Sequence, residues 1–216
     1  MSNKLKCQSL FSFKSGLFKS IFDKYEYPWE IIPYIKTLSE LEIEGYTEIK
    51  NGVFAGDGVV IDESARVDGP AIIGAGTEIR HGAYIRGAVI IGSGCVIGNS
   101  SELKNCIIMD RCQIPHFNYV GDSVLGNGVH LGAGAICSNL RSDKSSVTVV
   151  VEGKKIDTGL RKLGAILGDG VEIGCGTVLC PGAVIGKNTS VYPLTLIRGT
   201  YPCASIVKND GTVASK

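Results

Sequence analysis

The sequence predicts an all-β protein, namely a left-handed parallel β-helix of hexapeptide repeats with a short α-helical N-terminal cap and one protruding hairpin or loop. Three observations predict this fold. An aliphatic side chain returns at every sixth residue over long stretches, 29 of the 216 residues are glycine, and 44% of the residues are nevertheless apolar. Repetition reconciles the last two, because each repeat supplies one inward side chain and one tight turn.

The repeat runs through the chain in three stretches. Its aliphatic positions are Ile61, Val67, Ile73, Ile79, Ile85, Ile91, Ile97, Leu103 and Met109, then, with two slips of one residue, Ile114, Val120, Leu125, Leu131 and Cys137, and finally Leu167, Ile173, Leu179, Ile185, Val191 and Ile197. A period of six fits neither an α-helix nor a simply alternating strand. Three hexads form one triangular coil of 18 residues, so these twenty positions predict six to seven coils, stacked about 4.8 Å apart.

The sequence divides into a helical cap at residues 1–50, a β-helix domain at 51–207 and a tail at 208–216. Helical patterns cover Leu10 to Phe22 and Pro28 to Glu40, and we expect them to close the open lower end of the β-helix, where strand edges are exposed. Residues 138–166 break the repeat, and the β-branched run within Ser146 to Val151 predicts a hairpin or long loop. An excursion of this length is usually functional.

Charge and hydropathy exclude several classes of function. With 22 Lys and Arg against 21 Asp and Glu, the chain offers no electrostatic case for binding nucleic acid. No run approaches the roughly 18 to 20 apolar residues of a membrane span, and the N-terminus has no signal-peptide core, so we expect a cytoplasmic protein. Eight cysteines without a CxxC pair predict free, mostly buried thiols.

The winding brings two basic residues together. Arg86 and Lys104 lie 18 residues apart and each follows an inward aliphatic residue, so we expect them on one edge of the β-helix. Two cations about 5 Å apart repel unless an anion compensates them, which predicts a cradle for a phosphate or carboxylate. A solvated face with Glu102 as partner is the alternative. Tyr119 and Asn139 are expected near the same edge.

One histidine falls beside this edge. His116 follows Ile114 on the adjacent face, where the repeat slips, and an outward imidazole there predicts a general base near neutral pH. A purely structural or exposed role remains open. We predict no metal site, because His81 and His116 lie two coils apart, about 10 Å, and His130 is displaced along the face; only a neighbouring subunit could complete one.

Three stretches carry a family resemblance: Gly98 to Asn105, Pro115 to Ser123, and Leu131 to Ala135 continuing to Asn139-Leu140-Arg141. They resemble the acetyltransferase domain of bifunctional N-acetylglucosamine-1-phosphate uridyltransferase/glucosamine-1-phosphate acetyltransferases, and of archaeal-type sugar-1-phosphate nucleotidylyltransferases that carry this domain. The similarity covers residues 50 to 207. It implies a homotrimer with active sites between subunits, acetyl-CoA as the acyl donor, and an amino-sugar 1-phosphate as the acceptor.

The resemblance also implies residue roles. The catalytic residues would be His116, as general base toward the attacking amine, and Asn139. The acceptor would be bound by Arg86, Lys104, Tyr119, His130 and Lys144, and the acyl-CoA by Ala133, Lys162, Gly164, Ala165 and Cys175. Three positions depart from the family. His130 replaces a sugar-contacting asparagine, Cys175 replaces a serine, which is a stronger hydrogen-bond donor, and Lys144 represents only approximately the lysines expected after Asn139.

Other functions stay open at this stage. One is a non-catalytic trimer that binds a sugar phosphate or acts as a scaffold, and another is an O-acyltransferase or an enzyme using a longer acyl chain. The roughly 50 residues before the repeat could not hold the family's nucleotidyltransferase domain. We therefore expect no nucleotidyltransferase activity.

Overall fold

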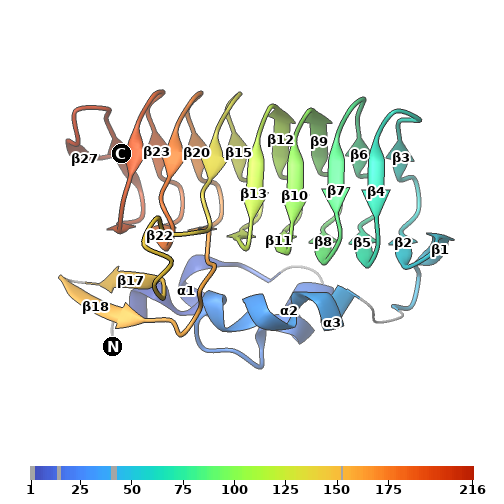
Figure 1. The fold of residues 1–216 in the computed structure, drawn as a ribbon, viewed down its shortest axis with the longest axis horizontal. Helices are drawn as coiled ribbons and strands as arrows, with labels where there is room; N and C mark the ends of the chain where they lie inside the picture. Colours follow the sequence, from blue (N-terminus) through green and yellow to red (C-terminus); the bar gives the residue numbers. More distant parts are fainter. Residues whose placement is uncertain (1–2, 14–15, 40–42, 152) are drawn as a thin grey trace.

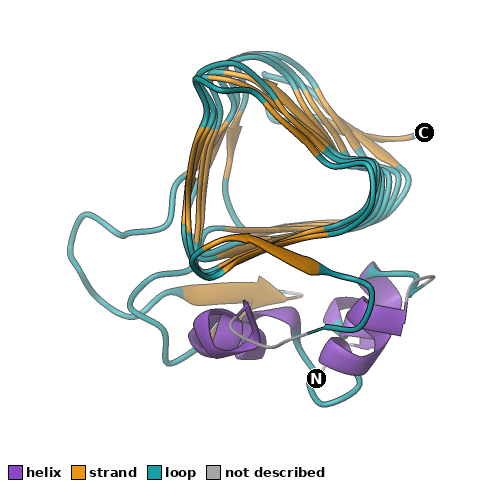
Figure 2. Cartoon of the chain, turned by 90° about the vertical axis from the view of Figure 1, so that its right-hand side faces the viewer, coloured by secondary structure: helices purple, strands orange, loops and turns teal. Residues whose placement is uncertain are grey.

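A computed structural model describes residues 3–13, 16–39, 43–151 and 153–216, and in it the chain winds into a long triangular prism (Figures 1 and 2). Three parallel sheets form its walls, which confirms the predicted left-handed parallel β-helix. Among the described residues, walls 1 and 2 each contain eight parallel strands and wall 3 contains seven. The prism thus has about eight turns rather than six to seven, because the winding already begins at Val53 and continues to Val207.

The strands of the three walls follow one another in order along the chain. Wall 1 consists of β1 (Thr47–Lys50), β2 (Val53–Ala55), β5 (Ala71–Ile73), β8 (Val89–Ile91), β11 (Cys106–Ile108), β14 (Val124–Leu125), β19 (Ala165–Leu167), β22 (Ala183–Ile185) and β25 (Thr200–Tyr201). Wall 2 consists of β3 (Val60–Ile61), β6 (Glu78–Ile79), β9 (Val96–Asn99), β12 (Gln113–His116), β15 (His130–Leu131), β20 (Glu172–Ile173), β23 (Ser190–Val191), β26 (Ser205–Val207) and β27 (Val213–Ser215). Wall 3 consists of β4 (Arg66–Asp68), β7 (Tyr84–Arg86), β10 (Glu102–Lys104), β13 (Tyr119–Gly121), β16 (Ile136–Cys137), β21 (Val178–Leu179) and β24 (Leu196–Ile197).

The two ends of the winding carry antiparallel strands. Strand β1 pairs with β2, and β27, which lies in the predicted tail, pairs with β26. These pairings give each of the two outer strands, β2 and β26, a hydrogen-bonding partner on its otherwise open side.

The repeated aliphatic positions fill the prism. Ile73, Ile85, Ile97 and Leu103, for example, have no exposed surface and belong to one continuous core. Met109 is an exception to the predicted register, since Ile108 takes the inward place and Met109 packs outside the prism.

The corner between walls 3 and 1 explains why Ile108 and not Met109 faces inward. There the chain turns one residue earlier at Asn105 and again at Asp122, both in the left-handed region with φ of 47° and 48°, a conformation that Asn and Asp tolerate. The first of the two slips therefore lies between Leu103 and Ile108, and Leu103 pairs with Val120 only 17 residues further on.

The N-terminal segment consists of η1 (Asn3–Leu5), α1 (Cys7–Leu10), α2 (Gly16–Phe22), η2 (Pro28–Tyr34) and α3 (Ile35–Ser39). The predicted helix from Leu10 to Phe22 is interrupted, because Phe11 and Phe13 leave the helical path and place their rings against Phe22. The end of the second predicted helix, Glu40, lies outside the described residues, as do Lys14 and Ser15 within the first.

The predicted position of this segment as an end cap is wrong. The helices lie along wall 1, parallel to the length of the prism (Figures 1 and 2). Wall 1 has outward aliphatic side chains that are fully buried in one cluster with residues of the segment and of the excursion, namely Ile72, Ile90, Ile107, Val124, Ile166 and Val184. Covering this apolar wall removes more surface from water than closing a narrow end would.

The excursion at residues 138–166 contains the predicted hairpin, formed by β17 (Thr148–Val151) and β18 (Lys154–Asp157). It also lies over wall 1, next to the helices (Figure 1). Val147 and Val149 are buried in the same cluster as Val184. None of the described helices has the length and apolar character needed to cross a membrane.

Candidate functional site

The two basic residues of wall 3 are neighbours, as predicted. Strands β7 and β10 pair in parallel, with Leu103 opposite Ile85, so the next residues, Arg86 and Lys104, stand side by side. Arg86 Nη1 lies 2.7 Å from Glu102 Oε1, and this hydrogen bond raises the pKa of Arg86. The partner considered in the sequence is therefore present, and any anion binding to Arg86 competes with Glu102.

Arg86 and Lys104 line a groove at the corner between walls 3 and 1. Its volume is about 390 Å³, and its lining also includes Asn105 and Asp122 from the tightened corner and Lys36 from α3. The groove thus combines three cations with a carboxylate and an amide. Such a lining suits a compact polar anion better than an apolar ligand.

A hydrogen-bonded cluster of Asn105, Asp122, Asn139 and Tyr119 adjoins this groove. The buried carboxylate of Asp122 accepts a hydrogen bond from Asn105 Nδ2 at 2.7 Å and another from Asn139 Nδ2. Asn139 Nδ2 also donates to the Tyr119 hydroxyl at 3.3 Å. Burial, and then the negative charges of Asp122 and Glu102, raise the pKa of Tyr119, so its phenol stays protonated at neutral pH.

His116 lies at the opposite end of wall 3, at the corner with wall 2, and its side chain is exposed. Phe117 follows in the left-handed region, and the buried Asn118 fixes the corner by accepting a hydrogen bond from the His116 backbone N–H at 3.1 Å. Among the described residues no side chain hydrogen-bonds to the imidazole. The ring is therefore accessible to a ligand, and its neighbour among the described aromatic rings is Phe117, with ring centroids 6.5 Å apart.

The residues expected to bind acyl-CoA fall into two groups. Ala133 and Cys175 follow His116 on successive coils of the same corner, as shown by the hydrogen bonds from Gly134 to His116 and from Gly176 to Ala133. Lys162 and Gly164 lie at the other corner of wall 3, close to Asn139. One protomer therefore does not bring the five positions together.

Two positions of this set have no exposed side chain. Ala165 points into the prism core, and a side chain at the buried Gly164 would collide with the Gly121 carbonyl oxygen. The inward place of Ala165 in β19 leaves only its backbone for the expected contact with an acyl-CoA. Gly164 serves close packing at the return of the excursion.

The remaining two acceptor candidates lie apart from the groove. His130 is on wall 2, where its Nδ1 lies 2.9 Å from Glu172 Oε2. Lys144 is exposed in the excursion, in a turn that Arg141 and Asp143 stabilise through their ion pair. Neither residue lines the groove of Arg86 and Lys104.

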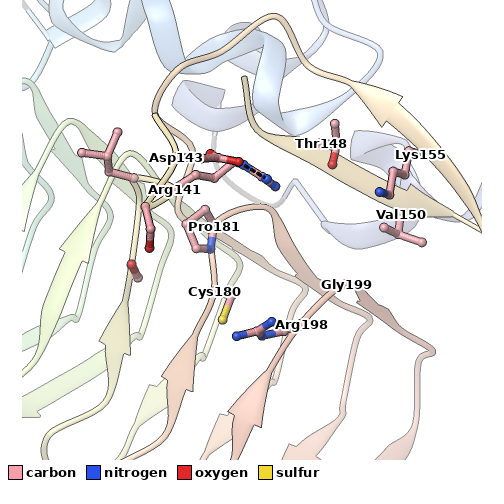
Figure 3. Close-up of a pocket in the computed structure, with 12 residues that line it drawn as sticks. Arg141, Asp143, Thr148, Val150, Lys155, Cys180, Pro181, Arg198 and Gly199 are labelled. Atoms are coloured by element: carbon pink, nitrogen blue, oxygen red, sulfur yellow. Dashed lines mark hydrogen bonds and ion pairs between the residues drawn. The ribbon is translucent and has the colours of Figure 1, made fainter. Parts of the chain in front are cut away.

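A second pocket, of about 500 Å³, lies between the excursion and the C-terminal strands of wall 3, β16, β21 and β24 (Figure 3). Lys155 of the hairpin and Arg198, which follows β24, both line it, and neither forms an ion pair within the described part of the chain. Arg141, in contrast, is engaged by Asp143. The pocket therefore presents two uncompensated cations to a ligand, beside the region where Leu140 pairs with Lys162.

The cysteines match the prediction of free, mostly buried thiols. All eight are free, and Cys7, Cys95, Cys106, Cys112 and Cys137 are buried. Burial raises the pKa of Cys137 to about 12, which makes this thiol a poor nucleophile at neutral pH. Among the described residues no three His, Cys, Asp or Glu side chains are grouped to hold a metal ion.

Sequence reasoning missed Asp122, Asn105, Asn118 and Lys36. The slips of the repeat were a usable signal for the first two, because a shortened corner needs residues that adopt the left-handed conformation. The place of Lys36 follows from the packing of α3 on wall 1, which the repeat pattern of the β-helix does not encode.

Comparisons with known proteins give a consistent result. Residues 67–209 match the family described as the GMPPB C-terminal domain. The chain is 33% identical over 192 residues to an uncharacterized acetyltransferase, YaiX, of Escherichia coli O6:K15:H31 (strain 536 / UPEC), covering 81% of this chain and 84% of that protein.

A bifunctional sugar-1-phosphate nucleotidylyltransferase/acetyltransferase of Sulfurisphaera tokodaii is 43% identical over 96 residues, which is 44% of this chain but 24% of that protein. The chain thus spans about a quarter of this longer relative. Among solved structures, a UDP-N-acetylglucosamine acyltransferase from Campylobacter jejuni is similar with a TM-score of 0.44 and 18% identity, covering 77% of this chain and 71% of that one.

Proposed function

The chain belongs to the family of the GMPPB C-terminal domain, and we propose that it transfers an acetyl group from acetyl-CoA to the amine of an amino-sugar 1-phosphate. The observation that carries this proposal is the arrangement on wall 3. The stacked Arg86 and Lys104 line a groove at one corner, the Tyr119–Asn139 pair adjoins it, and the exposed His116 lies at the other corner. The similarity to an acetyltransferase over most of both chains supports the reaction class.

The groove at the corner of walls 3 and 1 would hold the phosphate of the acceptor. Lys104 contributes a point charge, and Arg86 contributes a planar donor group that suits phosphate oxygens. Because Glu102 holds Arg86 at 2.7 Å in the free protein, phosphate binding would displace this carboxylate. Tyr119 and Asn139 would then contact the sugar, since they stand next to the groove on the same wall.

The excursion pocket would hold the donor. CoA carries phosphate groups, and the pocket offers Lys155 and Arg198, for which the described part of the chain provides no ion-pair partner. When bound, acyl-CoA would supply the thioester carbonyl carbon that the amine attacks. The homotrimer implied by the family resemblance would unite this pocket of one subunit with Ala133 and Cys175 of another, which a single chain keeps at separate corners.

The chain's own residues would then manage the protons. His116 would accept a proton at an imidazole nitrogen as the amine nitrogen forms its bond to the carbonyl carbon, and the same proton can pass to the sulfur as the carbon–sulfur bond breaks. Asn139 would orient the amine through its amide oxygen, because both described hydrogen bonds of its side chain use Nδ2. Holding the two reactants in place would contribute much of the remaining rate.

Replacing His116 tests this proposal. For His116→Ala we expect turnover to fall by roughly 10²- to 10⁴-fold, the usual contribution of a general base, while binding of CoA stays intact. His81→Ala is the matched control, because His81 is also exposed at this corner, on a coil nearer the N-terminus. There its backbone carbonyl accepts a hydrogen bond from Asn99 Nδ2. A thiol-release assay and calorimetry measure the two quantities, and near-normal turnover of His116→Ala would overturn the role.

A second function is favoured by one observation. The Glu102 carboxylate already compensates Arg86, and this is what a non-catalytic scaffold trimer with a solvated wall would show. Thermal shifts separate the two functions, because a ligand that binds the folded state raises its melting temperature. Acetyl-CoA and glucosamine 1-phosphate should each stabilise the enzyme, whereas a bare scaffold should respond to neither.

A further inference from the structure

We propose that Lys36, on helix α3 of the N-terminal segment, is the third cation of the acceptor-phosphate site formed by Arg86 and Lys104. This inference rests on the proposed function, which it deepens by giving the N-terminal segment a part in acceptor recognition. Lys36 lies outside residues 67–209, the region that matches the family. The site would therefore combine two cations of the family domain with one that precedes it.

The first observation is that the N-terminal segment and the β-helix both line the groove. Its lining includes Lys36 from α3, Arg86 and Lys104 from wall 3, and residues of the corner between walls 3 and 1. The N-terminal segment thus contributes to the groove itself and does not merely cover wall 1.

The second observation is that α3 is fixed next to the groove. Ile35, which precedes Lys36, is fully buried in the cluster that joins the segment to wall 1, and Ile32 is 3% exposed. The Ile32 carbonyl also accepts a hydrogen bond from Asn105 Nδ2 at 3.5 Å, and the same amide donates to Asp122 at 2.7 Å. The corner residue Asn105 therefore connects the segment directly to the polar cluster of the site.

The third observation concerns charge. Glu102 compensates Arg86, and the Asp122 carboxylate is buried and engaged by two amides. Within the described part of the chain, the ammonium groups of Lys36 and Lys104 form no ion pair, although both residues line the same groove. Two uncompensated ammonium groups match the two negative charges of a phosphate monoester, with Arg86 available once Glu102 yields.

Calorimetry of the full chain at low salt tests the proposal, with glucosamine 1-phosphate, inorganic phosphate and CoA as separate probes. Loss of one charge-assisted hydrogen bond should weaken binding of the two phosphate probes roughly tenfold in Lys36→Ala, with CoA unaffected. Lys36→Arg should retain most of the affinity. Lys24→Ala is the matched control, because Lys24 is an exposed lysine of the same segment that does not line the groove.

Each result has a definite meaning. Unchanged phosphate binding in Lys36→Ala, an effect on CoA alone, or no phosphate binding by the unaltered protein would overturn the proposal. In the transfer assay, we expect Lys36→Ala to raise KM for the acceptor with little change in kcat, because the phosphate is remote from the reacting amine. If the unaltered protein binds phosphate through Lys36 but transfers no acetyl group, the proposed function fails while the assignment of Lys36 stands.

Discussion

The direction of one amide decides how Asn139 can act. Asp122 is a buried carboxylate and can only accept hydrogen bonds, so the nitrogen atoms of Asn105 and Asn139 must face it. Asn139 then offers its oxygen to a ligand, and an oxygen is what an attacking amine needs as an acceptor. In the proposed reaction, Asp122 would accordingly be a positioning residue that acts through Asn139.

Asp122→Asn tests this coupling. The amide that replaces the carboxylate has one oxygen for the two donors, Asn105 Nδ2 and Asn139 Nδ2, and its own NH₂ group would face one of them. We therefore expect a loss of roughly 1–3 kcal/mol in unfolding free energy and a lower kcat. If Asp122 acts through Asn139, adding Asp122→Asn to Asn139→Ala should lower kcat no further. Additive losses in this cycle would show an independent role. Asp210→Asn serves as the control, because Asp210 is an exposed carboxylate of the tail that lines neither the groove nor the excursion pocket.

Among the structural elements, the N-terminal segment shows what a repeat pattern can and cannot predict. The inward positions could be predicted because one aliphatic residue recurs in each hexad. The pattern did not predict that the helices pack along wall 1, although the sequence of this wall indicates it. Its strands Ala71-Ile72-Ile73, Val89-Ile90-Ile91 and Cys106-Ile107-Ile108 are apolar at the outward middle position too. A strand that is apolar on both faces is buried on both, so these triplets indicate a wall that another element covers.

Ile31→Ala measures the strength of this cover. Ile31 is fully buried in the cluster between the segment and wall 1, and removing three carbon atoms there should cost about 2–5 kcal/mol. The matched control is Ile49→Ala on β1, where the isoleucine is 52% exposed and a change within about 0.5 kcal/mol is expected. Urea unfolding measures both, and equal losses would contradict the role of the segment as a packed part of the fold.

At the scale of the whole molecule, the sequence predicted the winding and the stacking of Arg86 on Lys104, because both depend only on the coil length. It did not predict the groove as a unit, since Lys36 arrives through packing of a segment without repeats. It placed Met109 in the core where the structure has Ile108, because a corner can lose one residue without changing the apolar pattern nearby. The residues expected to bind acyl-CoA lie at two corners, and this separation likewise depends on where the excursion leaves and rejoins the prism.

The stacked core makes the stability of the whole prism sensitive to alkali. The Cys137 thiol lies between Val120 and Leu179 in the core, and burial raises its pKa from an ordinary 9.0 to about 12. Because the folded-state pKa is the higher one, the stabilisation is complete below pH 9 and is lost as the pH rises toward 12. At pH 10.5 the unfolded chain has released this proton and the folded chain has not, which lowers the unfolding free energy by about 2 kcal/mol.

Urea unfolding at pH 7, 9 and 10.5 should show this loss, and Cys137→Ala should reduce the dependence on pH by one thiol's share even though the cavity lowers its stability at every pH. Cys203→Ala, which removes one thiol at an exposed position, is the matched control. The comparison uses slopes with pH, so the titration of lysines and tyrosines, which all variants share, cancels. Identical slopes for the protein and Cys137→Ala would mean that the thiol is not held in the dry interior that the winding creates.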